Sequence, residues 1–144
     1  IVKIFRPKKN SKEISNFLIN LRNKKYVRDN SLNDKLIKIK DHENWLYSFF
    51  KNRKNKIFII KMKKKFIGYL RLQQKYNSYE ASWAILNKFK GKKIITKSLR
   101  KITKNSKHSY KAIIREKNIA SIKAASNAGF KIKKKIKSLV YMYK

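Results

Sequence analysis

The stretch Tyr79-Glu80-Ala81-Ser82-Trp83-Ala84-Ile85-Leu86, continued by Asn87-Lys88-Phe89-Lys90-Gly91-Lys92-Lys93-Ile94-Ile95, decides how this 144-residue chain folds. Its apolar and aromatic first half predicts a strand, and residues 87–92 form a short basic loop. A helix is expected from about Lys93 to Lys104. A glycine turn that opens a helix gathers unpaired N–H groups at one point, where they suit an anionic phosphate.

The rest of the pattern places this strand and turn in the middle of one sheet. Three strands joined by short connections predict an antiparallel meander at 56–62, 66–72 and 79–86. The other expected elements are a strand at 1–5, a helix capped by Asn10 and running to about Lys24, a loop at 26–33, a helix capped by Asp41, a strand at 110–115, a helix at 119–128 ended by Gly129, and two strands within 130–143. This order predicts a single α/β (α+β) domain over residues 1–144. We expect a mixed, mostly antiparallel sheet of about seven strands with about four helices.

The composition is strongly basic, with 41 Lys and Arg against 7 Asp and Glu and a formal net charge of +34. Hydrophobic residues make up 42% of the chain, enough for a core, so wholesale disorder is not expected. Only seven of the cations are Arg, the residue that reads bases and phosphates bidentately, and the lysines are spread over the whole chain. Lys, Ile and Asn all have A/T-rich codons, so an A/T-rich genome is the simpler explanation of the charge, and we do not expect nucleic acid as the partner.

Several classes of site and location are excluded by what the chain lacks. With no Cys there is no disulfide, thiolate metal site or cysteine nucleophile, and two distant His residues do not predict a metal. The apolar runs reach only about four residues, too short to span a membrane. We therefore expect a cytoplasmic protein without a membrane partner, as a monomer or a homodimer.

The turn and a second segment, Asn118-Ile119-Ala120-Ser121 through Ala128-Gly129-Phe130, resemble the core of the GCN5-related N-acetyltransferases (GNAT superfamily). In that family a central strand feeds a basic turn, Q/R-x-x-G-x-G/A, that opens a helix. An Asn downstream opens a second helix that finishes in Gly-Phe. The order of elements matches across nearly the whole chain. The resemblance implies acetyl-CoA as cosubstrate and an amine as acceptor.

The resemblance also implies which residues bind the cosubstrate: Ile85, Leu86, Lys90, Gly91, Lys92, Lys93, Ile94, Ile95 and Asn118. A backbone N–H near Ile85 or Leu86 would bind the oxyanion, where the family splays two strands apart. Lys93 and Ile95 depart from the pattern, which has small residues there, and Ala125 stands where many members carry a Tyr that protonates the departing thiolate. An ordinary basic turn, and a simple N-cap at Asn118, are the alternatives.

Four residues ahead of the first long strand carry a resemblance on the acceptor side: Arg28, Ser31, His42 and Trp45, in the order Val-Arg-x-x-Ser and His-x-x-Trp. They resemble the branch that acetylates amino groups of nucleotide-linked sugars, in pseudaminic-acid-type pathways for flagellin and surface polysaccharide. In that branch the first helices and their loop wall the acceptor pocket. The positions i and i+3 place His42 and Trp45 on one helix face. The alternatives are a core Trp45, an exposed His42 and a surface Arg28.

The scarcity of acids narrows the choice of a general base. Of the seven carboxylates only Glu80 lies inside a predicted central strand, on the same face as Ser82. Glu80 also falls where many family members place the base. We expect it to accept the amine proton, directly or through water. The alternative is a surface carboxylate paired with a neighbouring Lys.

Two functions of different classes follow. The first is acetyl transfer to a primary amine on a nucleotide-linked sugar. A positive surface attracts the anionic groups of such a sugar, whereas it would repel a cationic polyamine. The second is a non-catalytic basic module that binds RNA or an acidic partner. A basic stripe on one face with exposed aromatics would favour the module, and an even coat of lysines would not.

Overall fold

The computed structural model describes all of residues 1–144 as one arrangement of strands and helices. The elements, in chain order, are β1 (Val2–Phe5), α1 (Lys12–Arg22), α2 (Lys25–Arg28), α3 (Ile39–Lys51), β2 (Lys56–Met62), β3 (Lys65–Lys75), β4 (Ser78–Ile85), the 3₁₀-helix η1 (Asn87–Phe89), α4 (Ile94–Ile102), β5 (Ser109–Arg115), α5 (Ile119–Asn127), β6 (Lys131–Ile136) and β7 (Leu139–Tyr143).

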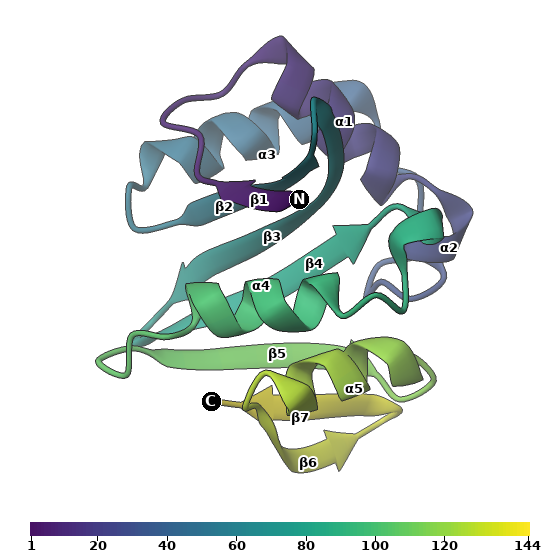
Figure 1. Cartoon of the computed structure of the whole chain (residues 1–144), viewed down its shortest axis with the longest axis vertical. Helices are drawn as coiled ribbons and strands as arrows, with labels where there is room; N and C mark the ends of the chain where they lie inside the picture. The colour runs from purple at the N-terminus through teal and green to yellow at the C-terminus, as the bar shows by residue number, and fades with distance from the viewer.

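All seven strands belong to one sheet in the order β1-β2-β3-β4-β5-β7-β6. Every neighbouring pair is antiparallel except β4 and β5, which run parallel. In Figure 1 the sheet winds from β1 and β2 at the top to β6 at the bottom, with α4 and α5 in front of it. The predicted α/β class, and a mixed sheet of about seven strands, are confirmed.

Helices cover both faces of the sheet and enclose two apolar clusters. The smaller cluster joins α1 and α3 to Ile57 and Ile59 of β2. The larger cluster packs α4 and α5 against the middle and later strands, with Leu99 and Phe130 almost fully buried. At the far edge of the sheet, all six residues of β6 are exposed, and four of them are Lys. The sheet therefore has a covered middle and an open, lysine-rich edge.

The expected element boundaries are close to the observed ones, with three differences before β2. The side chain of Ser11, not Asn10, caps α1 by accepting from the Ile14 N–H. The α3 helix begins at Ile39, two residues before the expected cap Asp41. Residues within the expected loop form the one-turn helix α2, which has no capping side chain and no buried residue. The sequence did not predict α2 because this helix has neither a capping side chain nor an apolar stripe, and its position depends on contacts with distant residues such as Asn87.

Gly68 of β3 marks a close approach between β3 and β4. A Cβ at this position would lie 2.8 Å from the Ala84 carbonyl oxygen and 3.2 Å from Ile60 Cδ1. The carbonyl belongs to the backbone and cannot rotate away, so any side chain at this point would push β4 from its place. β4 is the strand that carries the predicted site, and Gly68 helps to position it.

We predict that Gly68→Ala lowers the free energy of unfolding by about 1–3 kcal/mol, the usual range for overpacking a buried position. Urea unfolding followed by circular dichroism measures the change. Gly91→Asn is the matched control, because nothing lies within 4 Å of a Cβ there and Asn tolerates the positive φ of +78°. Equal stabilities for the Gly68→Ala variant and the wild type would contradict the steric role of this glycine.

Candidate functional site

The site begins where β4 and β5 part. The two strands pair only through Ser78–Glu80 and Ser109–Lys111, and β4 continues without a partner on that side. The Leu86 N–H donates to the Ile67 carbonyl of the β3 side at 2.8 Å. Since N–H groups alternate in direction along an antiparallel pair, the N–H groups of Trp83 and Ile85 point the other way, into the gap. Of the two expected backbone donors, Ile85 is therefore open and Leu86 is engaged.

On the α4 side of this gap lies a cavity of about 330 Å³, here called the turn cavity, whose wall includes Lys90, Gly91 and Lys93. The backbone N–H groups from Gly91 to Thr96 donate no hydrogen bond within the chain. Gly91 has φ +78° and Lys93 has φ +60°, so Lys93 adopts the left-handed conformation that favours glycine. The turn keeps a glycine-like path although a lysine occupies it.

Most of the residues expected to bind a cosubstrate line the turn cavity: Ile85, Lys90, Gly91, Lys93, Ile94, Ile95 and Asn118. Leu86 and Lys92 do not, and the Lys92 ammonium lies 5.8 Å from the centre of the Phe89 ring. The side chain of Ile95 is 9% exposed and belongs to the larger core cluster, so most of its bulk is directed inward. Asn118 caps α5 by accepting from the Ser121 N–H, as the N-cap alternative held, and it also borders the cavity, where binding of a cosubstrate stays a prediction.

On the other face lies a cavity of about 380 Å³, here called the Glu80 cavity, whose wall includes Ser31, His42, Trp45 and Glu80. His42 is 5% exposed, not exposed as one alternative held, and its Nε2 lies 3.1 Å from the Ser15 carbonyl oxygen. Burial lowers the pKa of His42, and the bond to Ser15 and the charge of Glu43 oppose that shift. Trp45 packs on the smaller core cluster and borders the cavity as well.

Arg28 is the expected acceptor residue that the structure does not bring into either cavity. Its guanidinium donates to the carbonyl oxygens of Asn23 and Asp34. Arg22 similarly donates to the Asn33 carbonyl, and Arg115 of β5 donates to the carbonyls of Ser31 and Leu32 at 2.6 and 3.0 Å. Three arginines thus hold the loop between α2 and α3 by its backbone, and Arg28 shapes the wall indirectly.

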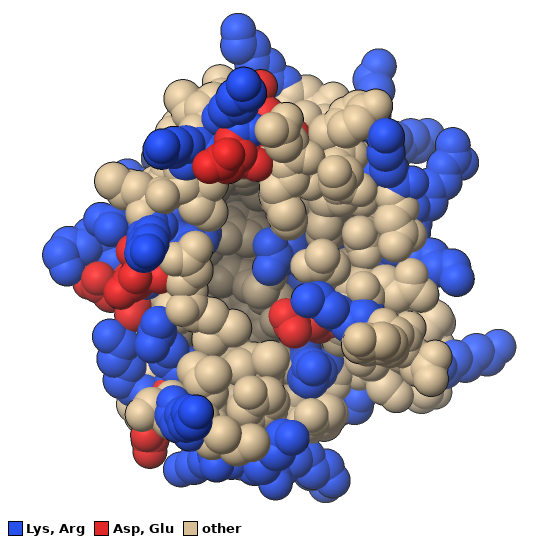
Figure 2. Space-filling model, turned by 180° about the vertical axis from the view of Figure 1, so that it is seen from behind, with Lys and Arg blue, Asp and Glu red and all other residues tan.

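The two cavities adjoin at the gap between the strands. Both are bordered by the same six residues: Val27, Asn30, Ser31, Trp83, Asn118 and Ser121. Figure 2 shows the molecule from behind, hollowed at its centre, with walls formed mostly by residues other than Lys, Arg, Asp and Glu. A ligand in one cavity can therefore meet a ligand in the other next to the open Ile85 N–H.

The cavity residues that were not predicted from the sequence include three with long polar side chains, Arg22, Tyr69 and Arg71. A signal for the last two was present, because Tyr69, Arg71 and Gln73 alternate with the buried Leu70 and Leu72 along β3. Alternation of this kind puts three polar side chains on one face of a central strand. Arg22, at the end of α1, had no comparable signal and needs the fold to be seen.

Comparison with known families explains this arrangement. The model of the acetyltransferase (GNAT) domain matches residues 4–131. The chain belongs to the GNAT family of acetyltransferases. Within that family, Ala125 stands at the position where many members have a Tyr; it is completely buried, so no side chain from this position reaches a cavity.

Solved structures share the GNAT fold over nearly the whole chain. A domain from Methanocaldococcus jannaschii is 20% identical with a TM-score of 0.84, covering 100% of this chain and 99% of the other. The spermidine N-acetyltransferase of Vibrio cholerae, solved with CoA and spermine, is 14% identical with a TM-score of 0.82 and coverages of 99% and 94%. The Campylobacter jejuni N-acetyltransferase PseH, solved with acetyl-CoA, is 18% identical with a TM-score of 0.73 and coverages of 100% and 98%.

A comparison with curated protein sequences gives no match. None of the helices has the length and apolar character needed to span a bilayer. No group of three or more His, Cys, Asp or Glu side chains is arranged to hold a metal ion.

We predict that His42 makes the fold less stable as the pH falls. Its folded pKa lies below the reference value of 6.5, so the unfolded chain takes up the proton first. The free energy of unfolding should be unaffected by this group above pH 6.5 and should decrease as the pH drops below it, by at most about 1.4 kcal/mol per pH unit. His42→Gln should flatten the slope of the free energy of unfolding between pH 7.5 and 5.5. His108→Gln, at an exposed position, is the control, and an unchanged slope in the His42 variant would contradict the assignment.

Proposed function

We propose that this chain is an acetyl-CoA-dependent N-acetyltransferase whose acceptor is a primary amine on a nucleotide-linked amino sugar. The observation that carries the proposal is the meeting of two cavities at the parted strands, with free N–H groups in one and the Glu80 carboxylate in the other. One cavity can hold an anionic cosubstrate and the other an amine, with their reacting ends at the junction.

The turn cavity fits the pyrophosphate of coenzyme A. The unpaired N–H groups from Gly91 to Thr96 supply donors and the positive end of the α4 dipole, and Lys90 and Lys93 add positive charge. Lys90 is held in place by its ammonium, 4.5 Å from the centre of the Tyr26 ring, and the Tyr26 hydroxyl accepts from the Asn87 N–H at 2.9 Å. Tyr26 thus links α2 to the turn.

In the reaction we propose, Glu80 accepts the proton of the acceptor amine, directly or through water. This proton leaves the neutral amine as its nitrogen attacks the thioester carbonyl, and the Ile85 N–H donates to the oxygen that becomes negative. When the tetrahedral species collapses, the carbon–sulfur bond breaks and the sulfur leaves as a thiolate. Since Ala125 supplies no acid, water or Ser121 at the junction donates a proton, or the sulfur leaves as an unprotonated thiolate, because thiols are far more acidic than alcohols.

The acceptor is proposed from the wall of the Glu80 cavity. Ser31, His42 and Trp45 border it, as the resemblance to enzymes of nucleotide-linked sugars implies, and one structural neighbour is the N-acetyltransferase PseH. The cavity has two guanidinium groups, Arg22 and Arg71, against one carboxylate, which disfavours a polycation such as the spermine in another neighbour. Acetyl-CoA and nucleotide-linked sugars are made in the cytoplasm, so we propose that location for the reaction.

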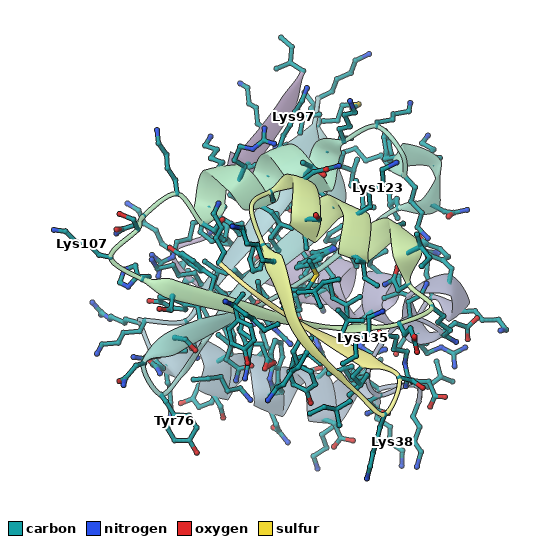
Figure 3. The ribbon with its side chains drawn as sticks, turned by 90° about the horizontal axis from the view of Figure 1, so that it is seen from below. Lys38, Tyr76, Lys97, Lys107, Lys123 and Lys135 are labelled. Atoms are coloured by element: carbon teal, nitrogen blue, oxygen red, sulfur yellow. The ribbon has the colours of Figure 1, made fainter.

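The alternative of a basic RNA-binding module has little support from the charge distribution. Lysines on α4, α5 and the loops point away from the molecule on different sides, as Lys97, Lys123, Lys107 and Lys38 do in Figure 3. An even coat of this kind does not form the single-face stripe that nucleic-acid binding favours. Salt-sensitive RNA binding without any stabilisation by acetyl-CoA would reverse this preference.

We predict that acetyl-CoA raises the melting temperature by several degrees, because a ligand at a hundred times its Kd stabilises the folded state by about 2.7 kcal/mol. The double variant Lys90→Ala Lys93→Ala should weaken binding about threefold to tenfold in isothermal titration calorimetry, since two exposed cations leave while the N–H groups stay. Lys64→Ala Lys65→Ala removes the same charge from the β2–β3 turn and the first residue of β3, and is the matched control. No thermal shift at millimolar acetyl-CoA would contradict the proposal.

We predict that Glu80→Gln lowers kcat about 10²-fold to 10⁴-fold, the usual contribution of a general base, and leaves the affinity for acetyl-CoA unchanged. Initial rates of CoA release across pH 6–9 measure the effect. Glu116→Gln, at an exposed carboxylate next to β5, is the control for the loss of one negative charge. Turnover that stays undiminished at every pH would exclude Glu80 as the base.

A further inference from the structure

The arginines of this chain fall into three groups according to their hydrogen bonds. Five donate to main-chain carbonyl oxygens and so brace loops: Arg6, Arg22, Arg28, Arg100 and Arg115. Arg53 is exposed to solvent. Arg71 alone lies in a cavity with a buried Nε and makes no hydrogen bond or ion pair within the chain. A buried N–H donor without a partner is costly, which calls for a reason.

The position of Arg71 on the sheet puts it beside the proposed reaction site. Arg71 pairs in register with Ser82 of β4 on one side and with Ile57 of β2 on the other. Glu80 lies two residues from Ser82 on the same face, diagonal to Arg71. Glu80 is therefore a neighbour of Arg71 without forming an ion pair with it. Trp45 supports the guanidinium from the α3 side, with its ring centre 5.1 Å from Cζ.

A second guanidinium faces the same cavity. One nitrogen of Arg22, Nη2, binds the Asn33 carbonyl, while Nη1 is buried and has no partner. Burial lowers the pKa of Arg22, and the charges of Arg71 and Arg28 lower it further, against a raising effect of Tyr69. Burial also raises the pKa of Tyr69, so its hydroxyl stays a neutral donor on the face that bears Arg71. Donors and positive charge thus accumulate in a partly apolar cavity.

We propose that Arg71 and Arg22 form an anion subsite in the Glu80 cavity, which binds a phosphate or carboxylate group of the acceptor and so orients its amine toward Glu80. The inference rests on the proposed function and adds to it where the negative group of the acceptor binds. Guanidinium groups present paired donors that match the oxygens of both kinds of anion, and the bonds are strong where water is excluded. The sites for the anion and for the amine are neighbours on one sheet face. A dication that places one amine at Glu80 would therefore bring its other positive charge close to the two guanidinium groups, which repel it.

The direct test is equilibrium binding of small anions to protein saturated with CoA, which fills the turn cavity. Inorganic pyrophosphate, uridine diphosphate and succinate are titrated by calorimetry into the wild type, Arg71→Gln, Arg71→Lys and Arg53→Gln. We expect at least one anion to bind, and Arg71→Gln to weaken it about tenfold to a hundredfold, the usual loss for a charge-assisted hydrogen bond. Arg71→Lys should recover part of that loss. The anion that binds distinguishes phosphate from carboxylate.

The controls separate a subsite from surface charge and from a structural role. Arg53→Gln removes the same charge from the surface and should leave every affinity unchanged. Because Arg71 makes no hydrogen bond or ion pair in the chain, and only stacks on Trp45, Arg71→Gln should change the melting temperature of the ligand-free protein little or raise it. The inference is overturned if no anion binds, if Arg53→Gln weakens binding as much as Arg71→Gln, or if Arg71→Gln alters only the pH profile of turnover, which would make it a positioning residue for Glu80.

A kinetic comparison distinguishes failure of this inference from failure of the proposed function. Glucosamine and glucosamine 6-phosphate differ by one phosphate, and the subsite predicts a higher kcat/KM for the phosphate, with that preference lost in Arg71→Gln. If the wild type transfers acetyl to both sugars with equal kcat/KM, the anion subsite is contradicted while the proposed acetyltransferase activity stands. If anion binding depends on Arg71 but no amine causes release of CoA, the anion subsite stands while the proposed reaction is contradicted.

Discussion

The parting of β4 from β5 is the constraint on which the rest of this structure depends. A sheet gains stability by pairing backbone groups along its whole length, yet this parallel pair ends after Glu80 and Lys111. The unpaired edge of β4 then faces a gap where the two cavities meet. α4 and α5 on one side, and the loop after α2 on the other, close the gap without filling it. The candidate site is therefore the gap that forms where the pairing of β4 with β5 ends.

The gap stays open only if the loops around it are held rigidly. A chain with only 7 Asp and Glu residues has too few carboxylates to hold them by ion pairs. Lys25 with Asp29 forms the single ion pair. The arginines instead bind carbonyl oxygens, which are available at every loop and do not titrate. Arg115 contacts Ser31, 84 residues earlier in the chain, so this part of the wall of the Glu80 cavity is attached to the end of β5. The excess of positive charge is therefore compatible with a well-defined wall.

The sequence predicted the order of the strands and most helices because apolar periodicity and turn residues are local signals. It also predicted Glu80, from the rarity of carboxylates, and the turn around Gly91, although the roles of both stay predictions. The helix α2 was missed because its position depends on the contact between the Tyr26 hydroxyl and the distant Asn87 N–H. The cap at Ser11 was missed because it lies one residue after the predicted cap, Asn10, and both residue types can cap a helix. Arg71 was missed although the alternation along β3 puts it on one face of the strand, because the sequence does not show that a cavity lies on that face.

The open edge at β6 has a consequence for the behaviour of the protein in concentrated solution. An unpaired strand is a template for a strand of another molecule, and such contacts lead to aggregation. Lys131, Lys133, Lys134 and Lys135 place positive charge along this edge, so a second copy approaching edge to edge meets a row of like charges. The repulsion is screened as ionic strength rises. High salt, which leaves the apolar core intact, would therefore remove the barrier that keeps the edges of neighbouring molecules apart.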